Sequence, residues 1–393
     1  MDYLSSLADP RNAKNCCVDW SSVPEDLVSI IANKLIHIKD YTVFGAVCTS
    51  WQSIYARNRD NLPREALLLM LPTEDDKDGK TRSLYSLYEK KIYDNLKITL
   101  PHNLHCCGSS LGWLATVSET YQVSLINPFL PPDNEIQLPP LTTFDRHPTK
   151  EPICNQTFLK KVVLSADPIS NPNYMVMAIH SVRGRISFFK PGDKAWTPLD
   201  FEGICDVIYD QDEFYALQTE GHILVCDLNG PSPNIRSIGK AKKIYGDKKY
   251  LVKSSIGLLQ VRREIEYDSD DDSEEWDPET LTNDYPTTFE VFNYDPIMDN
   301  WEAVNSLDGR VLFVGDNSSL CLSISDMPGC KPNCIYFTDD YHARYFGHDS
   351  LGPSDVGVFD LEDWSNEAMY PTDSKTFVLA PIFIQPTTIH LQC

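Results

Sequence analysis

The chain has 393 residues, of which 42% are hydrophobic and 11% aromatic, so it is long and apolar enough to fold around a sizeable core. Its formal net charge of −23 argues against general binding to nucleic acids or anionic membranes, because phosphate contacts need clustered basic side chains. Without a secretory signal or an apolar run of roughly 20 residues, we expect a soluble protein of the cytoplasm, the nucleus or both, with its 12 cysteines reduced.

The pattern along the chain predicts three parts. Residues 1–17 show little periodicity and are expected to be a flexible leader. Residues 18–60 carry the pattern of a small helical module, and a polar connection near residue 61 marks a domain boundary. Residues 61–393 change to short β-like runs and predict a large second domain.

The helical module is predicted to contain two or three short amphipathic helices. Ser22 followed by Glu25 forms a capping box, and Pro24 is tolerated in the first turn, so a helix should begin here. Asp40 is expected to cap the next helical stretch. Apolar residues at helical spacing follow each start: Leu27, Ile30, Ile31 and Leu35, then Phe44, Val47, Cys48, Trp51, Ile54 and Tyr55.

The second domain is predicted to be all-β. The expected strands are 66–71, 82–88, 112–117, 122–126, 161–164, 175–179, 186–189, 204–209, 214–218, 223–227, 250–252, 257–261, 289–294, 311–314, 320–324, 334–338, 356–360 and 377–384. Regular short strands over this length favour a kelch-like β-propeller of six or seven blades, because a closed ring leaves no long open edges. We expect 66–71 to pair with 377–384 and so close the ring.

A weak internal repeat supports the propeller. A strand, a turn and then a tryptophan that opens the next strand recur at Trp196 and Trp301, with a looser copy at Trp364. Such tryptophans are expected to pack between neighbouring sheets.

One acidic insertion interrupts the β pattern. Residues 264–284 include a run of Asp, Ser and Glu that repels itself, which predicts a disordered, solvated loop between two strands. Ser269 within it is a candidate phosphorylation site. The nearby lysines either form a nuclear address or a solvated surface that balances the loop: they are Lys240, Lys242, Lys243, Lys248 and Lys249.

Motifs for catalysis are missing, so we expect no catalytic, cofactor-binding or metal-binding residues. Cys330 and Cys334 have no second Cys/His pair at zinc-finger spacing. The adjacent pairs at 16–17 and 106–107 are poorly placed to hold one zinc ion. His342 and His348 lie close in sequence to two aspartates at 339–340, a weak signal for a polar pocket.

Two sets of motifs resemble a known family. The run 23–27 (VPEDL), Leu35 and Val47-Cys48-x-x-Trp51 resemble an F-box, although Thr49 stands where a basic residue is commoner. The runs 108–113 (GSSLGW), 125–129 (LINPF), 136–141 (IQLPPL), 312–315 (LFVG), 326–340 and 357–363 (GVFDLED) resemble plant F-box proteins with a C-terminal KIB-type β-propeller. The alternative for the module alone is an ordinary helical hairpin that covers the next domain.

This resemblance implies a multidomain protein, a small all-α F-box followed by an all-β propeller, that serves as the substrate receptor of an SCF-type cullin-RING ubiquitin ligase. The F-box would bind a Skp-type adaptor, and through it a cullin, while the propeller holds a protein target. The implied adaptor-binding residues are Pro24, Leu27, Ile31, Leu35, Val47 and Trp51, with Trp51 more a packing anchor than a direct contact. Some family members are linked to degradation of GSK-type kinases, although nothing in this sequence selects that target.

Two other functions stay open at this point. One is a propeller interaction protein outside a ligase, whose helices serve only as a cap. The other is a propeller hydrolase or small-molecule binder, which a convergent polar pocket on the propeller axis would favour.

Overall fold

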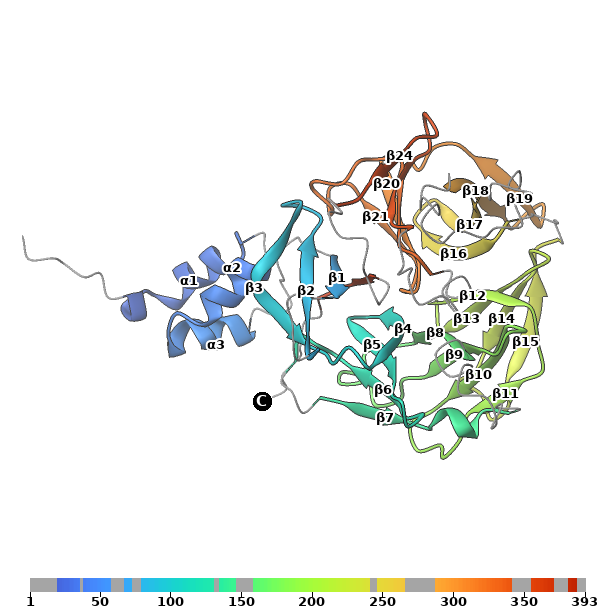
Figure 1. Ribbon diagram of the computed structural model, residues 1–393, viewed down its shortest axis with the longest axis horizontal. Coiled ribbons are helices and arrows are strands. Elements are labelled where there is room, and N and C mark those ends of the chain that lie inside the picture. The colour runs from blue at the N-terminus through green and yellow to red at the C-terminus, as the bar shows by residue number, and fades with distance from the viewer. Residues whose placement is uncertain are drawn as a thin grey trace, which may run out of the picture.

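Three helices lie beside a ring of β-sheets (Figure 1). The structure, a computed structural model, describes residues 20–35, 38–57, 67–72, 79–130, 134–145, 158–240, 246–265, 287–340, 355–370 and 381–386. The expected leader at 1–17, the boundary near residue 61, and Ser269, His342 and His348 all fall outside these residues.

The helical module contains a 3-10 turn, η2 (Trp20–Ser22), and the helices α1 (Glu25–Ala32), α2 (Ile38–Gly45) and α3 (Thr49–Arg57). The predicted capping box at Ser22 is wrong. Pro24 is the N-cap of α1, and its carbonyl accepts the N–H groups of Leu27 and Val28 at 3.0 and 3.1 Å. Because Ser22 already belongs to η2, the helix starts on the extended backbone of Pro24 instead. Asp40 lies in the first turn of α2, not at its cap.

A small core holds the three helices together. Val28 and Ala32 of α1 are buried with Phe44, Trp51 and Ile54. The rings of Phe44 and Trp51 lie 4.7 Å apart, and the indole N–H of Trp51 donates to the carbonyl of Trp20 at 3.0 Å. Gly45 ends α2 where α3 approaches closely, since a Cβ there would lie 2.7 Å from the ring of Tyr55. The apolar residues from Phe44 to Tyr55, which the sequence pattern placed in one helical stretch, are therefore divided between α2 and α3.

The six sheets of the described residues form the blades of a propeller. Of the two blade numbers predicted, six and seven, six is therefore correct. The first blade contains β1 (Leu68–Pro72), β2 (Thr81–Ser86), β3 (Lys91–Thr99) and β25 (Ile382–Ile384). The second contains β4 (His105–Ser110), β5 (Trp113–Val117), β6 (Val123–Ile126) and β7 (Ile136–Leu138). The third contains β8 (Leu159–Leu164), β9 (Val176–His180), β10 (Arg185–Phe189) and β11 (Thr197–Leu199).

The remaining blades follow in chain order. The fourth contains β12 (Ile204–Asp210), β13 (Glu213–Gln218), β14 (Ile223–Asp227) and β15 (Asn234–Ile238). The fifth contains β16 (Lys248–Ser254), β17 (Gly257–Ile265), β18 (Thr287–Asp295) and β19 (Asn300–Val304). The sixth has five strands, with β20 (Arg310–Val314), β21 (Leu320–Ser323), β22 (Cys334–Phe337), β23 (Gly357–Asp360) and β24 (Asn366–Ala368). Within it β20 and β22 run parallel, while every other strand pair is antiparallel among the described residues.

The two ends of the propeller sequence meet in the first blade. β1 pairs with β25, and the register places Leu68 opposite Ile384 and Met70 opposite Ile382. This confirms the predicted pairing of 66–71 with 377–384 for its described part. The ring therefore closes through a sheet that the chain completes only at its C-terminal strand.

The repeated tryptophans differ in their surroundings. Trp196 and Trp301 are buried and link neighbouring blades, as predicted. The indole N–H of Trp196 donates to the carbonyl of Pro139 at 2.8 Å, and that of Trp301 donates to Gly221 at 3.0 Å. Trp364 is 55% exposed, so the prediction of inter-sheet packing is wrong there. Its ring lies only edge-on to Phe359 of its own blade.

Trp301→Phe should lower the free energy of unfolding by about 1 kcal/mol, because it removes the hydrogen bond between the fourth and fifth blades and keeps most of the ring. Urea unfolding followed by circular dichroism measures the change. The matched variant Trp364→Phe should stay within about 0.5 kcal/mol of the parent. Equal effects of the two variants would contradict the inter-blade role of Trp301.

Polar residues fill the centre of the ring, where β4, β8, β12 and β16 converge (Figure 1). Lys161 forms a buried ion pair with Asp206, with 2.5 Å between Nζ and Oδ1. Asp206 Oδ2 accepts the backbone N–H of Leu251 at 2.8 Å and the hydroxyl of Ser319 at 3.1 Å. The backbone N–H of Ser318 reaches the carbonyl of Ser109 in β4 at 2.7 Å. The connection from β20 to β21 therefore reaches across the centre and joins the sixth blade to the second and fourth blades, neither of which is its neighbour in the ring.

The acidic insertion leaves the fifth blade from the end of β17. Glu264 and Ile265 belong to this strand, so the predicted loop boundary at residue 264 is wrong. Arg262, two positions away on the same face of the strand, forms an ion pair with Glu264, and this contact continues the strand past the first acidic residue. Residues 266–284 lie outside the described residues, between two strands of one sheet as expected.

Candidate functional site

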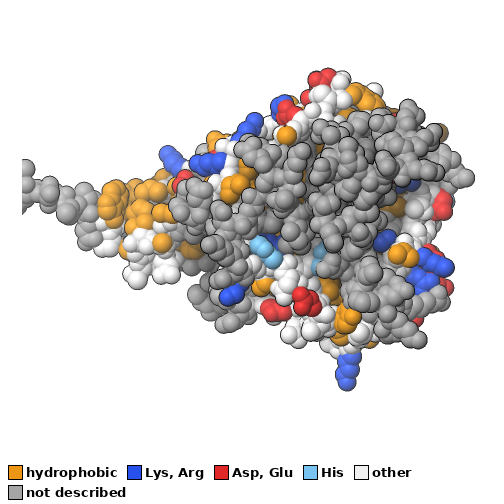
Figure 2. Space-filling view, viewed as in Figure 1, with side chains coloured by type: hydrophobic (Ala, Val, Ile, Leu, Met, Phe, Trp, Pro, Cys, Tyr) orange, Lys and Arg blue, Asp and Glu red, His pale blue; other side chains and the backbone are white. Residues whose placement is uncertain are grey.

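The helical module exposes an apolar surface. Figure 2 shows hydrophobic side chains gathered over the helices, to one side of the ring. Leu27 is 52% exposed and Ile31 is 37% exposed, although both lie on the apolar face of α1. Among the described residues of the module, the exposed large apolar side chains are Trp20, Leu27, Ile30, Ile31, Val43 and Val47, which we call the module surface. Several large apolar side chains on so small a module are typical of a protein-binding surface.

The six predicted adaptor-binding residues divide into three groups. Pro24, Leu27, Ile31 and Val47 are exposed, Leu35 is half-buried, and Trp51 is only 8% exposed. Sequence reasoning left out Trp20, Ile30 and Val43. Ile30 had a usable signal, because it shares the helical spacing of Leu27 and Ile31. Trp20 and Val43 had no such sequence signal, because no local pattern distinguishes them from core residues.

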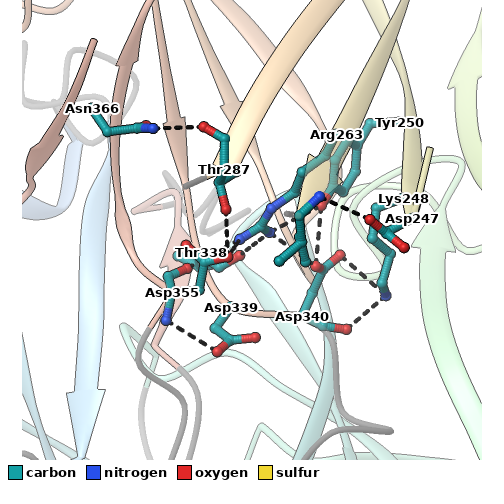
Figure 3. Close-up of polar contacts among 11 residues, drawn as sticks. Asp247, Lys248, Tyr250, Arg263, Thr287, Thr338, Asp339, Asp340, Asp355 and Asn366 are labelled. Atoms are coloured by element: carbon teal, nitrogen blue, oxygen red, sulfur yellow. Dashed lines mark hydrogen bonds and ion pairs between the residues drawn. The ribbon is translucent and has the colours of Figure 1, made fainter. Parts of the chain in front are cut away.

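The second candidate site is a buried ionic cluster between the fifth and sixth blades, drawn in Figure 3. Arg263 of β17 lies at its centre with no exposed side-chain surface. Its guanidinium donates to Asp355 Oδ2 at 2.5 Å, to the Thr338 carbonyl at 3.1 Å and to Asp340 Oδ1 at 3.3 Å. The ring of Phe337 lies 4.8 Å from the guanidinium carbon. We call these residues the Arg263 cluster.

Further contacts complete the cluster. The hydroxyl of Tyr250 donates to Asp340 Oδ1 at 3.1 Å, and that of Thr287 donates to Asp355 Oδ2 at 2.8 Å. Lys248 Nζ lies 2.7 Å from the Asp340 carbonyl and 3.5 Å from its Oδ2. The backbone N–H of Asp355 donates to Asp339. The cluster thus anchors residues 338–340 and 355 of the sixth blade against three strands of the fifth (Figure 3).

Electrostatics fix the protonation states in this cluster. Burial opposes the charged form of Arg263, but Tyr250 and the carboxylates of Asp355 and Asp340 raise its pKa above the ordinary value. Burial, followed by the negative charge of Asp340, raises the pKa of Tyr250 well above its ordinary value. A permanent cation held by carboxylates, with a neutral phenol beside it, joins the fifth and sixth blades.

Other residues that the sequence analysis singled out make structural contacts. Asp339 and Asp340 are buried in the Arg263 cluster. Lys249 is buried and donates to the Thr219 carbonyl at 2.5 Å, so the solvated surface predicted for these lysines is wrong at this position. Lys248 contacts Asp340, and 30% of its side chain stays exposed. Burial raises the pKa of Cys330 to about 11 and of Cys334 to about 12, which makes both thiols poor nucleophiles.

The described residues show neither a metal site nor a membrane-spanning helix. No group of three or more His, Cys, Asp or Glu among them is arranged to hold a metal ion. Their eight cysteines are all free. None of the helices in the described part of the chain is long and apolar enough to cross a bilayer. At the ring centre, Lys161 and Ser319 both contact the carboxylate of Asp206, so these three polar side chains join blades.

His180 should make stability depend on pH. Burial, with Arg185 beside it, lowers the pKa of His180 from 6.5 to about 4. The unfolded chain therefore binds an extra proton between these values, so stability is complete above about pH 6.5 and falls as the pH approaches 4. Between about pH 7.5 and pH 5 the loss should be about 2 kcal/mol. Urea unfolding at both pH values, for the parent and His180→Gln, measures it. An identical pH dependence in both chains would refute the assignment.

Comparisons with known proteins cover the helical module and the propeller together. A family model for the KIB1-4 beta-propeller matches residues 84–360. F-box protein SKIP23 of Arabidopsis thaliana is 26% identical over 406 residues, covering 93% of this chain and 96% of that protein. Putative F-box protein At5g55150 of the same plant is 24% identical, covering 94% and 98%. F-box protein At2g17036, also from this plant, is 24% identical, covering 95% and 96%.

Proposed function

The chain belongs to the KIB1-4 β-propeller family, as its motifs predicted, and on this premise we propose that it is the substrate-recognition subunit of an SCF-type cullin-RING ubiquitin ligase. In this proposal residues 18–60 form the F-box that binds a Skp-type adaptor. Residues 61–393 form the propeller that binds a protein target in the cytoplasm or nucleus. The names of the three relatives as F-box proteins support this assignment.

The module surface is the observation that carries the proposal. A helical module that only capped the propeller would turn its apolar side chains inward. Instead, α1 buries Val28 and Ala32 in the module core and leaves Leu27, Ile30 and Ile31 exposed. Leaving such side chains in water is unfavourable unless a partner covers them, and a helical adaptor face is the partner that the F-box resemblance implies.

The proposed mechanism needs no catalytic residue in this chain. The receptor holds a target lysine near a ubiquitin-charged enzyme, which converts an encounter between separate molecules into a reaction at high effective concentration. A rigid receptor serves this purpose better than a loose one, because the target then samples fewer unproductive orientations. The closed ring and the Arg263 cluster both restrict motion between blades. GSK-type kinases are one class of target that the family resemblance suggests.

Co-purification tests both ends of the receptor. Tagged full-length chain and a chain that lacks residues 1–60 are expressed in plant cells, and bound proteins are identified by mass spectrometry. The full-length chain should recover a Skp-type adaptor, a cullin and the target. The shortened chain should recover the target alone. An adaptor recovered equally with both chains, or with neither, would refute the ligase assignment and favour an interaction protein outside a ligase.

A further inference from the structure

Three lysines gather where inner strands of the third, fourth and fifth blades begin. Lys160 is the second residue of β8, and Lys248 and Lys249 are the first two residues of β16. Strand β12 packs against both β8 and β16 and carries Cys205 near its start. Burial raises the pKa of Cys205, and the charges of all three lysines oppose this rise, so the three ammonium groups lie around one thiol. We call the three lysines the lysine site.

Two of these lysines have no counter-charge. Lys160 Nζ donates to the Val182 carbonyl at 3.2 Å, and Lys249 Nζ donates to the Thr219 carbonyl. A carbonyl accepts a hydrogen bond without cancelling the charge of the donor. Neither lysine forms an ion pair with a carboxylate among the residues that the structure describes. Lys249 is only 8% exposed, so solvent screens its charge weakly.

Lys248 differs from the other two because it contacts a carboxylate. Its Nζ lies 3.5 Å from Asp340 Oδ2, but Arg263 shares this carboxylate with it (Figure 3). Burial lowers the pKa of Lys160, and the positive charge of Lys248 lowers it further. The ammonium groups of Lys160 and Lys248 therefore repel each other, although they come from different blades. An anion bound beside both would relieve this repulsion.

A ligand can reach the lysine site through two of its side chains. Lys160 is exposed, and the side chain of Lys248 is 30% exposed. An ammonium group has three N–H donors, and Lys160 uses one of them within the described part of the chain. The other donors of Lys160 are available to an acceptor on a ligand. The lysine site therefore combines accessible donors with a positive charge that the neighbouring carboxylate balances only in part.

A phosphate monoester matches this arrangement better than a single carboxylate does. It carries a charge of roughly −1.5 to −2 at pH 7 and three acceptor oxygens, so it can meet more than one ammonium group. The net charge of −23 disfavours anions in general at long range. A ligand of the lysine site must therefore gain its affinity from close contacts, which favours concentrated charge.

We propose that the lysine site binds a phosphorylated side chain of the protein target, with the phosphate in contact with Lys160 and Lys248 and with the charge of Lys249 nearby. The source of the phosphate rests on the proposed receptor function, whereas the anion-binding chemistry does not. On this proposal a kinase must modify the target before the propeller recognises it.

Peptide binding to the full-length chain tests the proposal. The probes are capped pentapeptides Gly-Gly-X-Gly-Gly in which X is phosphoserine, serine, glutamate or lysine, and ligand-observed NMR titration at one fixed salt concentration measures the affinity. The phosphoserine peptide should bind, the glutamate peptide should bind at least tenfold more weakly, and the other two should not bind. Lys160→Glu should weaken binding of the phosphoserine peptide about tenfold or more.

The matched control is Lys194→Glu, which makes the same charge change at an exposed position between β10 and β11 of the third blade and should bind as the parent does. Circular dichroism verifies that each variant folds, and Lys160→Gln replaces the first variant if that one does not. Failure of the phosphoserine peptide to bind, equal binding of the serine or glutamate peptide, or equal loss in the matched control would overturn the proposal.

Inorganic phosphate is the last probe. Its binding without any binding of the phosphoserine peptide would also overturn the proposal and assign the lysine site to a small anion. Adaptor binding is measured in parallel for every variant. A chain that binds the phosphoserine peptide but no adaptor would contradict the receptor function alone, whereas the reverse result would contradict only the lysine site.

Discussion

Leu27→Asp should weaken binding of the Skp-type adaptor by about thirtyfold or more. An aspartate at the centre of an apolar interface loses the packing of the leucine and must leave water without a partner, which together cost about 2 kcal/mol or more. The folding stability of the chain without adaptor should change little, since Leu27 is half exposed and lies outside the module core. Calorimetric titration of purified adaptor into the parent and the variant measures the difference in affinity.

The control for this experiment is Val182→Asp. Val182 lies in the β9–β10 turn of the propeller and is the more exposed of the two apolar residues. It receives the same new charge far in sequence from the module, so adaptor affinity should not change. Trp51→Ala is a different kind of variant, because it removes a core residue and should unfold the module, with a loss of about 3–5 kcal/mol. If Leu27→Asp left adaptor affinity unchanged, the module surface would not be the docking site.

Arg263→Met should lower the free energy of unfolding by about 3–5 kcal/mol. The substitution keeps a long apolar side chain against Phe337 but removes the cation from the buried Asp340, which keeps Lys248 nearby, and from the partly buried Asp355. Loss of a buried counter-charge beside carboxylates is strongly unfavourable. Because the cluster joins the fifth and sixth blades, we expect one cooperative transition at lower denaturant concentration, measured by urea unfolding.

Two comparisons separate lost charge from lost packing. Arg236→Met removes an arginine whose ion pair with Glu213 is largely exposed, so the loss should be about 1 kcal/mol or less. Adding Asp355→Asn to Arg263→Met removes one stranded charge and should recover part of the stability. If the Arg263 and Arg236 variants were equally stable, the Arg263 cluster would not hold the blades together.

Much of the propeller could be predicted from the sequence. The strands that pattern reasoning found are mostly central ones, such as β9, β14 and β22, in which nearly every residue is buried. The missed strands include β3, β7 and β15, each at the last-paired position of its sheet. The tryptophan repeat did predict a strand opening at Trp196 and another at Trp301, where β11 and β19 lie. An edge strand faces solvent on one side, so it can be short and polar, as Asn366–Ala368 is, and it then carries no apolar pattern. Strand β4 was missed for a different reason, because its Cys, Gly and Ser residues pack against the polar connection at the ring centre.

The candidate sites were less predictable than the strands. The sequence predicted an apolar stripe on α1 but not which half of it would stay in water. The Arg263 cluster joins residues almost 100 positions apart. No local pattern marks such residues, since charged side chains in loops are common and only their partners distinguish them.

By itself, the sequence determined the order and type of the elements, the closure of the ring by its two ends, and the F-box and KIB motifs. These properties depend on local periodicity and on turn residues, both of which are determined by residues close together in the sequence. Only the tertiary structure decided that Val28 is buried while Leu27 is exposed, that Trp301 joins two blades while Trp364 does not, and that Arg263 is a buried cation. The physical reason is that burial and charge balance depend on what lies opposite a side chain, and in a ring of blades the opposite residue comes from a distant part of the chain.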